Sequence, residues 1–486
     1  MITESRREIA KLLNKFEFSI NKTIFLFMFS LITSLMVAFI PHYEGMSSAA
    51  NWTLFILLFS ALLWMTEAIP AFAVSLLLIS LEIIILGEVD GIYATTANDW
   101  KLFISPWASS LIFLFIGGFI LALAASKTKL DIWIAKRVLG ISGSDPKNIL
   151  TGLMVVTFVF SMFISNTATT SMMLTILVPI IYKLKKDNPF NKTLLLGVAA
   201  AANIGGMGTI IGTPPNAIAV GALGINAPSF LGWMFYAVPP AIVLIVFIRY
   251  ILLKLYPSNE SNIKIDFIES IDSDDETTEK KNKKSDIPSW HKLTVIIVFA
   301  TTLFLWLTSS LHNLPTAVVA FLPIVVFTIT GIVDAEDIRT LPWEILLLIT
   351  GGLSLGLAVS NTGLASWFAT AIPTDRLDLF VVVIIFSFLV VLVSNFMSNT
   401  AATNILMPIV IAIIIGFTND NQILINTVII VALSASNAML LSVSTPPNAI
   451  VYSTGMIKSK NFLTIGIIIG IIGPIVIMSW IYMIFG

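Results

Sequence analysis

The chain has 486 residues, of which 57% are hydrophobic and 11% are charged, and its mean hydropathy is +0.95. A soluble protein carries about 25% charged residues, so most of this chain is expected to be surrounded by lipid or by other apolar helices. The net charge of −1 does not indicate a nucleic-acid partner, and the absence of cysteine excludes disulfides, thiolate metal sites and a cysteine nucleophile.

Apolar runs of spanning length predict transmembrane helices along the whole chain. The first follows a polar, basic start (residues 1–22) without a signal-peptide cleavage site, so we expect a retained helix within a segment 1–51. Uninterrupted runs cover 23–41, 52–69, 71–87, 108–126, 231–253, 291–311, 315–333, 342–360 and 461–485. Four more, at 148–182, 193–222, 377–417 and 422–453, are apolar but interrupted by Asn, Thr, Gly and Pro.

A single long hydrophilic segment, 257–289, separates two halves of the sequence. It is acidic over Asp272–Glu279 and basic over Lys280–Lys284, which is typical of a solvated linker. The sequence therefore predicts a first repeat over 52–256, a cytoplasmic linker over 257–289 and a second repeat over 290–486.

The two halves share motifs in the same order. Ser165-Asn166-Thr167-Ala168 pairs with Ser398-Asn399-Thr400-Ala401, and Thr213-Pro214-Pro215-Asn216 pairs with Thr445-Pro446-Pro447-Asn448. Shorter pairs, such as Gly117-Gly118 with Gly351-Gly352, keep the same order. We interpret this agreement as an internal duplication.

The distribution of basic residues predicts the topology. If the N-terminus is cytoplasmic and 148–186 is a hairpin that enters and leaves on one side, the basic segments 127–147 and 183–192 both face the cytoplasm. With 377–417 as a second hairpin that opens outward, 25 of the 27 Lys and Arg are cytoplasmic or at cytoplasmic helix ends, and only Lys101 and Arg376 lie outside.

This topology predicts an all-α polytopic membrane protein with about eleven transmembrane helices and two re-entrant hairpins. Each repeat then holds an odd number of crossings, so the repeats have inverted topology and the C-terminus is external. Inverted repeats with broken helices are typical of secondary transporters.

The two Ser-Asn-Thr triplets lie in the middle of the predicted hairpins, where the chain must turn inside the membrane. Lipid cannot satisfy the backbone groups that such a turn exposes, and helix N-termini beyond it attract anions. Asn and Ser oxygens suit a hard cation such as Na⁺, and hydroxyls and free N–H groups suit a carboxylate. A triplet can also merely cap a helix, but two copies at equivalent positions favour a binding role. We expect Asn166 or Asn399 to bind sodium, and Thr167 and Thr400 to bind the two carboxylates of a dicarboxylate.

The stretch Gly205–Asn216 is rich in glycine but is a weak candidate for a phosphate loop, because it has no preceding strand and no Lys-Ser/Thr ending. Its two consecutive prolines, repeated at Pro446-Pro447, instead predict a broken helix in each half.

Acidic residues are rare in the apolar runs. Glu67 and Glu82 lie within or near such runs and Glu344 starts one; an intramembrane acid is by default a functional candidate, whereas Glu67 at a helix end favours a structural role. No Lys, Arg or His lies near either triplet, so helix dipoles and bound cations would balance an anion. The sequence shows no nucleophile–base pair or metal-ligand cluster, which argues against an enzyme.

Together, the paired triplets, the paired Thr-Pro-Pro-Asn breaks and the stretch Thr66-Glu67-Ala68-Ile69-Pro70 resemble the divalent anion–sodium symporter family, which carries dicarboxylates, citrate or sulfate. The resemblance covers nearly the whole chain after about residue 50. It implies a homodimer in the bacterial inner membrane, working by an elevator-type motion, with sodium as the coupling ion and no organic cofactor.

The resemblance also implies site residues. The first sodium site would use Ser161, Ser165, Asn166 and the carbonyl of Gly212, and the second would use Ser394, Asn399 and Ser444. Substrate would be bound by Ser165, Asn166, Thr167, Thr213, Pro214, Ser398, Asn399, Thr400, Thr445 and Pro446.

The leading hypothesis is therefore a sodium-coupled importer of C4-dicarboxylates such as succinate, malate and fumarate. A sodium-independent dicarboxylate exchanger and a carrier of sulfate or another inorganic anion, both of the same fold, are the alternatives. A channel or a membrane enzyme is a further alternative, from a different functional class. The preferred dicarboxylate and the ion stoichiometry are not encoded in these motifs.

Overall fold

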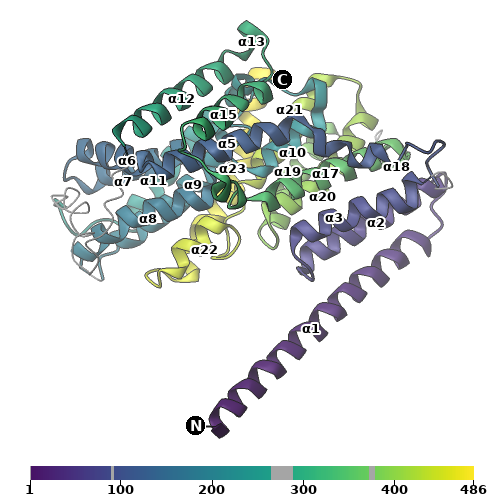
Figure 1. Ribbon diagram of the computed structural model, residues 1–486, viewed down its shortest axis with the longest axis horizontal. Coiled ribbons are helices and arrows are strands. Elements are labelled where there is room, and N and C mark those ends of the chain that lie inside the picture. Colours follow the sequence, from purple (N-terminus) through teal and green to yellow (C-terminus); the bar gives the residue numbers. More distant parts are fainter. Residues whose placement is uncertain (1, 89–91, 186, 264–287, 372–377) are drawn as a thin grey trace. The chain divides into compact units, whose positions relative to one another are not determined.

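The computed structural model describes residues 2–88, 92–185, 187–263, 288–371 and 378–486 (Figure 1). Across these ranges the regular elements are all helices, and none is a strand, as the sequence predicts. The charged part of the linker (272–284), Lys186 and Arg376 lie outside the described residues.

Eight helices of the described ranges are long and apolar enough to cross a membrane, and they coincide with predicted apolar runs. They are Ile20–Phe39, Ser48–Thr66, Lys101–Lys127, Phe230–Leu255, Trp290–Leu307, Trp343–Asn361, Asn399–Phe417 and Ser459–Phe485. Shorter apolar helices are Ala71–Gly87, Pro146–Ser161, Thr316–Ile329, Leu379–Ser394 and Asn421–Ala435. The number of crossings, eleven, stays a prediction.

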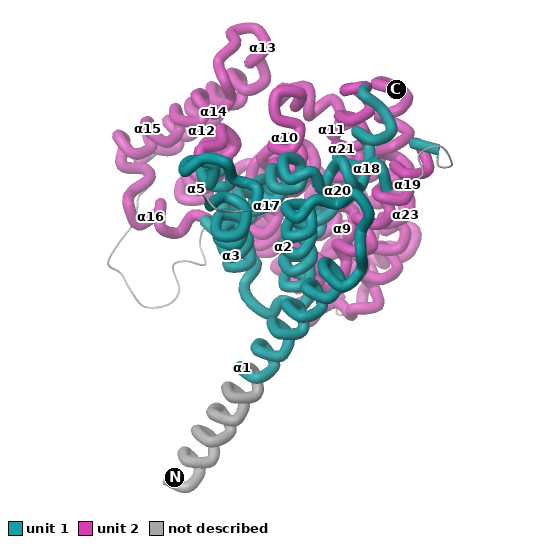
Figure 2. The backbone as a smooth tube through the Cα atoms, turned by 90° about the vertical axis from the view of Figure 1, so that its right-hand side faces the viewer, with its two compact units in different colours: residues 1–107, 343–379, 400–419 teal, residues 108–342, 380–399, 420–486 magenta. Residues whose placement is uncertain are grey.

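The chain divides into two compact units, coloured separately in Figure 2. Unit 1 comprises residues 1–107, 343–379 and 400–419, and unit 2 comprises 108–342, 380–399 and 420–486. Each unit draws on both predicted repeats, so the units do not correspond to the predicted halves.

Unit 1 is built around α3 and α17. A Cβ atom on Gly351 of α17 would lie 2.5 Å from the Cβ of Ser75 on α3, so this glycine permits the close approach of the two helices. The helices of unit 1 are α1 (Ile2–Phe39), α2 (Ser48–Thr66), α3 (Ala71–Leu81), α4 (Lys101–Ile104), α17 (Trp343–Asn361), α18 (Leu364–Ala371) and most of α20 (Asn399–Phe417).

A buried acid joins three of these helices. After α3 the chain forms a π-helical turn, η1 (Glu82–Gly87), and the side chain of Glu82 is fully buried. The Ser354 hydroxyl contacts the Glu82 carboxyl and lies 2.7 Å from the carbonyl oxygen of Phe103 in α4. One hydroxyl proton cannot serve two acceptors, so the contacts are satisfied when Ser354 donates to Phe103 and a protonated Glu82 donates to Ser354. Glu82 thus has a structural partner within unit 1.

Unit 2 contains the remaining helices. They are α5 (Ser110–Lys127), α6 (Leu130–Ser142), α7 (Pro146–Ser161), α8 (Asn166–Lys183), α9 (Phe190–Gly205), α10 (Pro214–Leu223), α11 (Phe230–Leu255), α12 (Ser289–Leu307), α13 (Ser309–His312), α14 (Thr316–Val319), α15 (Phe321–Ile329), α16 (Ala335–Arg339), most of α19 (Leu379–Ser394), α21 (Asn421–Ala435), α22 (Pro446–Ser453) and α23 (Ser459–Phe485).

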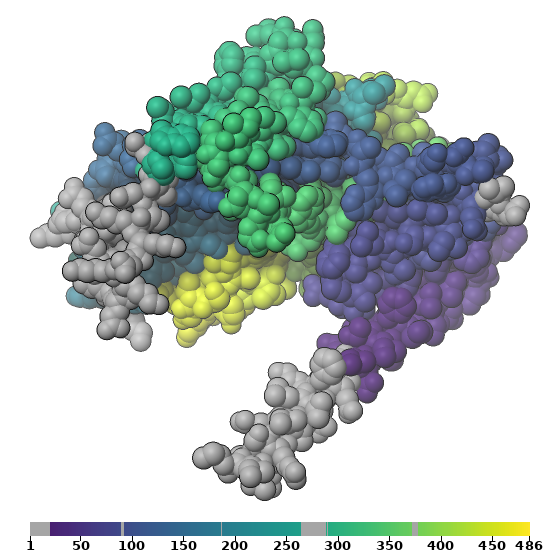
Figure 3. Space-filling model, viewed as in Figure 1, coloured from purple at the N-terminus to yellow at the C-terminus, as the bar shows by residue number. Residues whose placement is uncertain are grey.

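Helix α12 presents an apolar face at the surface of unit 2. Leu293, Ile297 and Phe304 are 57%, 54% and 63% exposed, and the helix lies on the visible face in the space-filling view (Figure 3). Large exposed apolar side chains on a spanning helix are expected where the helix meets lipid.

Helices are interrupted in each of the four stretches where the sequence predicts it. Loops over 162–165, 206–213, 395–398 and 436–445 separate α7 from α8, α9 from α10, α19 from α20 and α21 from α22, the second with a 3₁₀ turn, η3 (Gly206–Gly208). The paired prolines begin α10 and α22, where the missing N–H would have no intrahelical partner anyway. These interruptions lie within the stretches 148–186, 193–222, 377–417 and 422–453, and their arrangement as hairpins and broken helices in a membrane stays a prediction.

Candidate functional site

The first break, 162–165, brings three oxygen atoms together beside α9. The buried Ser161 hydroxyl lies 2.6 Å from Oδ1 of Asn166 and 2.6 Å from the carbonyl oxygen of Ala202. Because the hydroxyl has a single proton, it cannot donate to both oxygens at once. A cation among these oxygens would satisfy all three.

Ser165 has a local role at the same break. It is the N-cap of α8, and its hydroxyl accepts a hydrogen bond from the N–H of Ala168 at 3.2 Å. A capping serine leaves its second lone pair available to a ligand, so the cap and a binding role are compatible.

The second break, 206–213, packs directly on the first. A Cβ atom on Gly206 would lie 2.6 Å from Oδ1 of Asn166, and one on Gly212 would lie 3.1 Å from the carbonyl oxygen of Met162. The Thr209 hydroxyl also donates to that Met162 carbonyl. The glycines therefore serve close packing of two interrupted helices, which agrees with the rejection of a phosphate loop.

Asn216 holds the second break in shape. Its buried side-chain amide lies 2.9 Å from the carbonyl oxygen of Gly206, 3.3 Å from that of Met207 and 2.7 Å from that of Thr209. The indole N–H of Trp233 also donates to Met207, at 3.0 Å. These donors fix the direction of carbonyls that neither α9 nor α10 can pair.

The corresponding pair of breaks in the second predicted repeat uses Asn395. Its Oδ1 accepts from the N–H of Leu440 at 2.8 Å, and the Ser444 hydroxyl lies 3.1 Å from its carbonyl oxygen and 3.3 Å from its Oδ1. The Ser444 hydroxyl also accepts from the N–H of Leu441 at 2.9 Å. The 395–398 and 436–445 breaks are thus locked together by one asparagine.

Asn448 repeats the role of Asn216. Its amide donates to the carbonyls of Met439 at 3.1 Å and Leu441 at 2.9 Å, nine and seven residues earlier, the same intervals that separate Asn216 from Met207 and Thr209. Asn203 of α9 donates to Oδ1 of Asn448 at 3.3 Å. Through this bond the breaks of the two predicted repeats are connected within unit 2.

The structure brings together some of the predicted site residues. Ser161 and Asn166 meet directly, and Gly212 lies against the same loop. Ser444 meets Asn395, and the buried hydroxyl of Ser394 has no hydrogen-bond partner among the described residues.

The threonines and prolines of the predicted substrate site are placed less uniformly. Thr213 and Thr445 are the N-caps of α10 and α22, followed by Pro214 and Pro446, but only the Thr445 hydroxyl accepts a capping bond, from Asn448 N–H at 3.3 Å. Thr167 is exposed in unit 2, together with Ser398, and Asn399 is half-buried there, whereas Thr400 belongs to unit 1. A pocket shared by the two triplets therefore stays a prediction.

Four buried asparagines were missed by sequence reasoning: Asn203, Asn216, Asn395 and Asn448. The repeated Thr-Pro-Pro-Asn motif carried a signal for two of them, because its asparagine recurs at the same place. Asn203 and Asn395 carried none, since their partners lie 245 and 45 residues away. Glu67 is exposed and ends α2 with a φ of 50°, which agrees with the structural interpretation.

The breaks are electrically neutral. Hydroxyl, amide and carbonyl groups make the hydrogen bonds described above, and no charged side chain takes part in them. Within the described ranges no group of three or more His, Cys, Asp or Glu could hold a metal. Neutral oxygen donors suit a monovalent hard cation better than a divalent or transition metal.

These features define a multi-pass membrane transporter with paired broken helices. Residues 21–486 match the family described as the sodium:sulfate symporter transmembrane region, and the chain belongs to this family. The predicted family resemblance is confirmed.

Curated relatives agree over most of their length. The chain is 32% identical over 480 residues to the sodium-dependent dicarboxylate transporter SdcS of Staphylococcus saprophyticus, covering 90% of this chain and 87% of the relative. It is 31% identical to SdcS of Staphylococcus aureus strain USA300 (91% and 87% covered) and 30% identical to an uncharacterized transporter of Haemophilus influenzae (89% and 92% covered).

A solved structure shares the fold. The antimetabolite efflux pump MtrF of Neisseria gonorrhoeae superimposes with a TM-score of 0.55 at 13% identity, over 96% of each chain. At this identity the similarity concerns the fold alone.

Proposed function

We propose that the chain imports C4-dicarboxylates such as succinate, malate and fumarate, coupled to sodium. The observation that carries the proposal is the pair of neutral, asparagine-held breaks in unit 2, because neutral oxygens can bind sodium and leave an anion dependent on it. The names of the SdcS relatives support the same substrate class.

The first sodium ion is assigned to Ser161, Ser165, Asn166 and the Gly212 carbonyl. The second is assigned to Ser394, Asn399 and Ser444. The crowding of Ser161, Asn166 and the Ala202 carbonyl supports the first assignment. The substrate carboxylates are assigned to the two Ser-Asn-Thr triplets and to Thr213-Pro214 and Thr445-Pro446.

Transport by an elevator-type motion of a homodimer in the inner membrane completes the proposal, with the N-terminus cytoplasmic and the repeats inverted. Labelling tests this topology, because the chain has no cysteine. A cysteine at the exposed Asp187 should react from the cytoplasm only, and one at the exposed Ala97 from outside only. External labelling of Asp187→Cys in intact cells would contradict the inward-opening hairpin.

Uptake of radiolabelled succinate into proteoliposomes tests the function. We expect an inward sodium gradient to drive accumulation and an equal potassium gradient not to. Asn166→Ala and Asn399→Ala should abolish uptake or raise the sodium requirement wherever activity survives. Asn361→Ala, an exposed asparagine of α17, is the matched control.

Two results would redirect the proposal. Counterflow that needs internal dicarboxylate but no sodium would indicate the exchanger. Sulfate is tested separately as a competitor of succinate uptake, because the family description names it. Competition by sulfate as strong as by malate would indicate an inorganic-anion carrier.

A further inference from the structure

A cavity of about 220 Å³ opens beside the first break of unit 2. Ser165 lies on its wall, and Asp131 of α6 is another of its lining residues. The other polar residues that line it are Ser126, Thr169 and Thr340. One water needs roughly 10–15 Å³ of such volume, so the cavity can hold a hydrated cation.

Asp131 is the acid of this cavity. Its side chain is nearly buried, with 5% of the residue exposed, and burial raises the pKa of its carboxyl. Oδ1 accepts the N–H of Ile132 at 2.8 Å, and the described part of the chain supplies no ion pair to Asp131. A buried carboxylate without a positive partner is costly, and either a proton or a bound cation relieves that cost.

Thr169 supplies a second, independent observation. It is fully buried, it lines the cavity, and its hydroxyl has no hydrogen-bond partner within the described residues. One carboxylate and several hydroxyls make a donor set of low charge. Such a set fits a monovalent cation, whereas Ca²⁺ sites in proteins use six to eight oxygens and several carboxylates.

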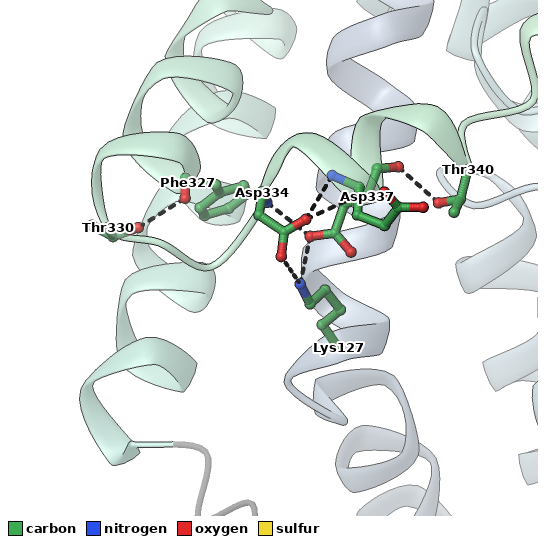
Figure 4. A network of polar contacts seen from close by, with 7 residues as sticks. Lys127, Phe327, Thr330, Asp334, Asp337 and Thr340 are labelled. Atoms are coloured by element: carbon green, nitrogen blue, oxygen red, sulfur yellow. Dashed lines mark hydrogen bonds and ion pairs between the residues drawn. The ribbon is translucent and has the colours of Figure 1, made fainter.

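The lysine nearest in sequence to this wall is engaged elsewhere. Lys127, at the end of α5, lies 2.5 Å from Asp337 and 3.9 Å from Asp334 at the start of α16 (Figure 4). Asp334 and Asp337 also form the capping box of that helix. The Lys127 ammonium group is thus held by two other acids and is not the partner of Asp131.

We propose that Asp131 forms a transient sodium-binding site, here called the waypoint, between the first break and the face of the protein that carries the basic segment 127–147. The proposal rests on the sodium coupling proposed above and adds a residue to its path. Sodium leaving the site at Ser161 and Asn166 passes Ser165 and Thr169, pauses at Asp131 and then enters the water on the basic face.

Sodium dependence measured separately from each face tests the waypoint. In oriented proteoliposomes, Asp131→Asn should raise the half-saturating sodium concentration about fivefold or more on the basic face and leave that of the opposite face unchanged. Asp131→Glu should restore the wild-type value. Equal sodium dependence of wild type and Asp131→Asn on both faces would overturn the proposal.

A second measurement leaves Asp131 intact. Thr340→Cys places a single thiol on the cavity wall of the cysteine-free chain. In water, a charge about 6 Å away changes the reaction rate of a charged reagent by roughly threefold, and it acts in opposite directions on a cationic and an anionic reagent. The ratio of the rates for cationic and anionic methanethiosulfonates should therefore be about tenfold higher in Thr340→Cys than in the double variant Thr340→Cys/Asp131→Asn. Sodium should lower this ratio, and N-methylglucamine at equal ionic strength should not.

The two measurements separate the inference from the proposed function. If succinate uptake needs sodium but sodium leaves the ratio of cationic to anionic reaction rates unchanged, the waypoint alone is overturned. Uptake that needs no sodium overturns the proposed function, while a ratio that still falls with sodium supports a cation site at Asp131.

Discussion

Replacing Asn216 by alanine removes the donor that orients the carbonyls of the 206–213 break. The amide has two protons and its shortest contacts are 2.7 Å to Thr209 and 2.9 Å to Gly206. Two hydrogen bonds contribute about 0.5–1.5 kcal/mol each, and a buried carbonyl left unpaired costs about 1–3 kcal/mol. We expect a loss of about 2–4 kcal/mol, shared between folding stability and sodium binding.

If roughly 1.4 kcal/mol of this falls on sodium binding, the half-saturating sodium concentration rises about tenfold. Succinate uptake against sodium concentration measures this, and thermal unfolding in detergent measures the remainder. Asn448→Ala should behave alike, because its amide bonds carbonyls at the same intervals. The control, Asn361→Ala, loses one exposed bond to Leu357. Asn216→Ala with wild-type stability and sodium dependence would refute the reasoning.

Three further predictions concern other parts of the chain. Thr167→Ala and Thr400→Ala should each raise the KM for succinate about tenfold, or about 1.4 kcal/mol; normal transport by both variants in uptake assays would contradict a carboxylate role. Glu82→Gln should keep both stability and transport, because its amide can replace the carboxylic acid as donor to Ser354. Glu82→Ala should lower the unfolding temperature. Loss of stability or transport in Glu82→Gln would show that the ionised acid is needed. Lys127→Ala should change stability by less than about 1 kcal/mol, as expected for a partly exposed ion pair, and the double variant with Asp337→Ala should show a coupling of the same small size in a thermal-melt cycle.

Local patterns in the sequence predicted the helices and their interruptions. Apolar runs gave the spans, and Pro214-Pro215 and Pro446-Pro447 gave the breaks, because a proline acts on its own backbone. The run 71–87 predicts one span, and the structure has one apolar helix over Ala71–Gly87, which is shorter than the eight helices of spanning length. Its π-helical turn at Glu82 was not foreseen, since that turn accompanies contacts with Ser354, which is 272 residues away.

The site was predictable only in part, for the same reason. The triplets mark where the chain must turn, but the atoms around Ser161 include a carbonyl from Ala202, which is 41 residues further on. Asn395 gives no periodic or motif signal, although it holds two breaks together. Sequence spacing therefore identified the polar turns, whereas their supporting asparagines depend on tertiary packing.

The neutrality of the four breaks bears on how coupling can arise. An arginine beside the triplets would bind a dianion without help, and transport would not require sodium. Among the hydrogen bonds that hold the described breaks together, the groups are hydroxyls, amides and carbonyls, so a dianion would bring two charges into a region of low dielectric with helix dipoles as the fixed compensation. Desolvating an uncompensated ion costs several kcal/mol, and bound cations at hydrogen-bonding distance from the same turns remove that cost. Affinity for the anion then depends on sodium, and affinity for sodium depends on the anion to the same degree. In this arrangement, coupling arises because the protein supplies no positively charged side chain of its own. The charge of the substrate is then compensated only when sodium is bound as well.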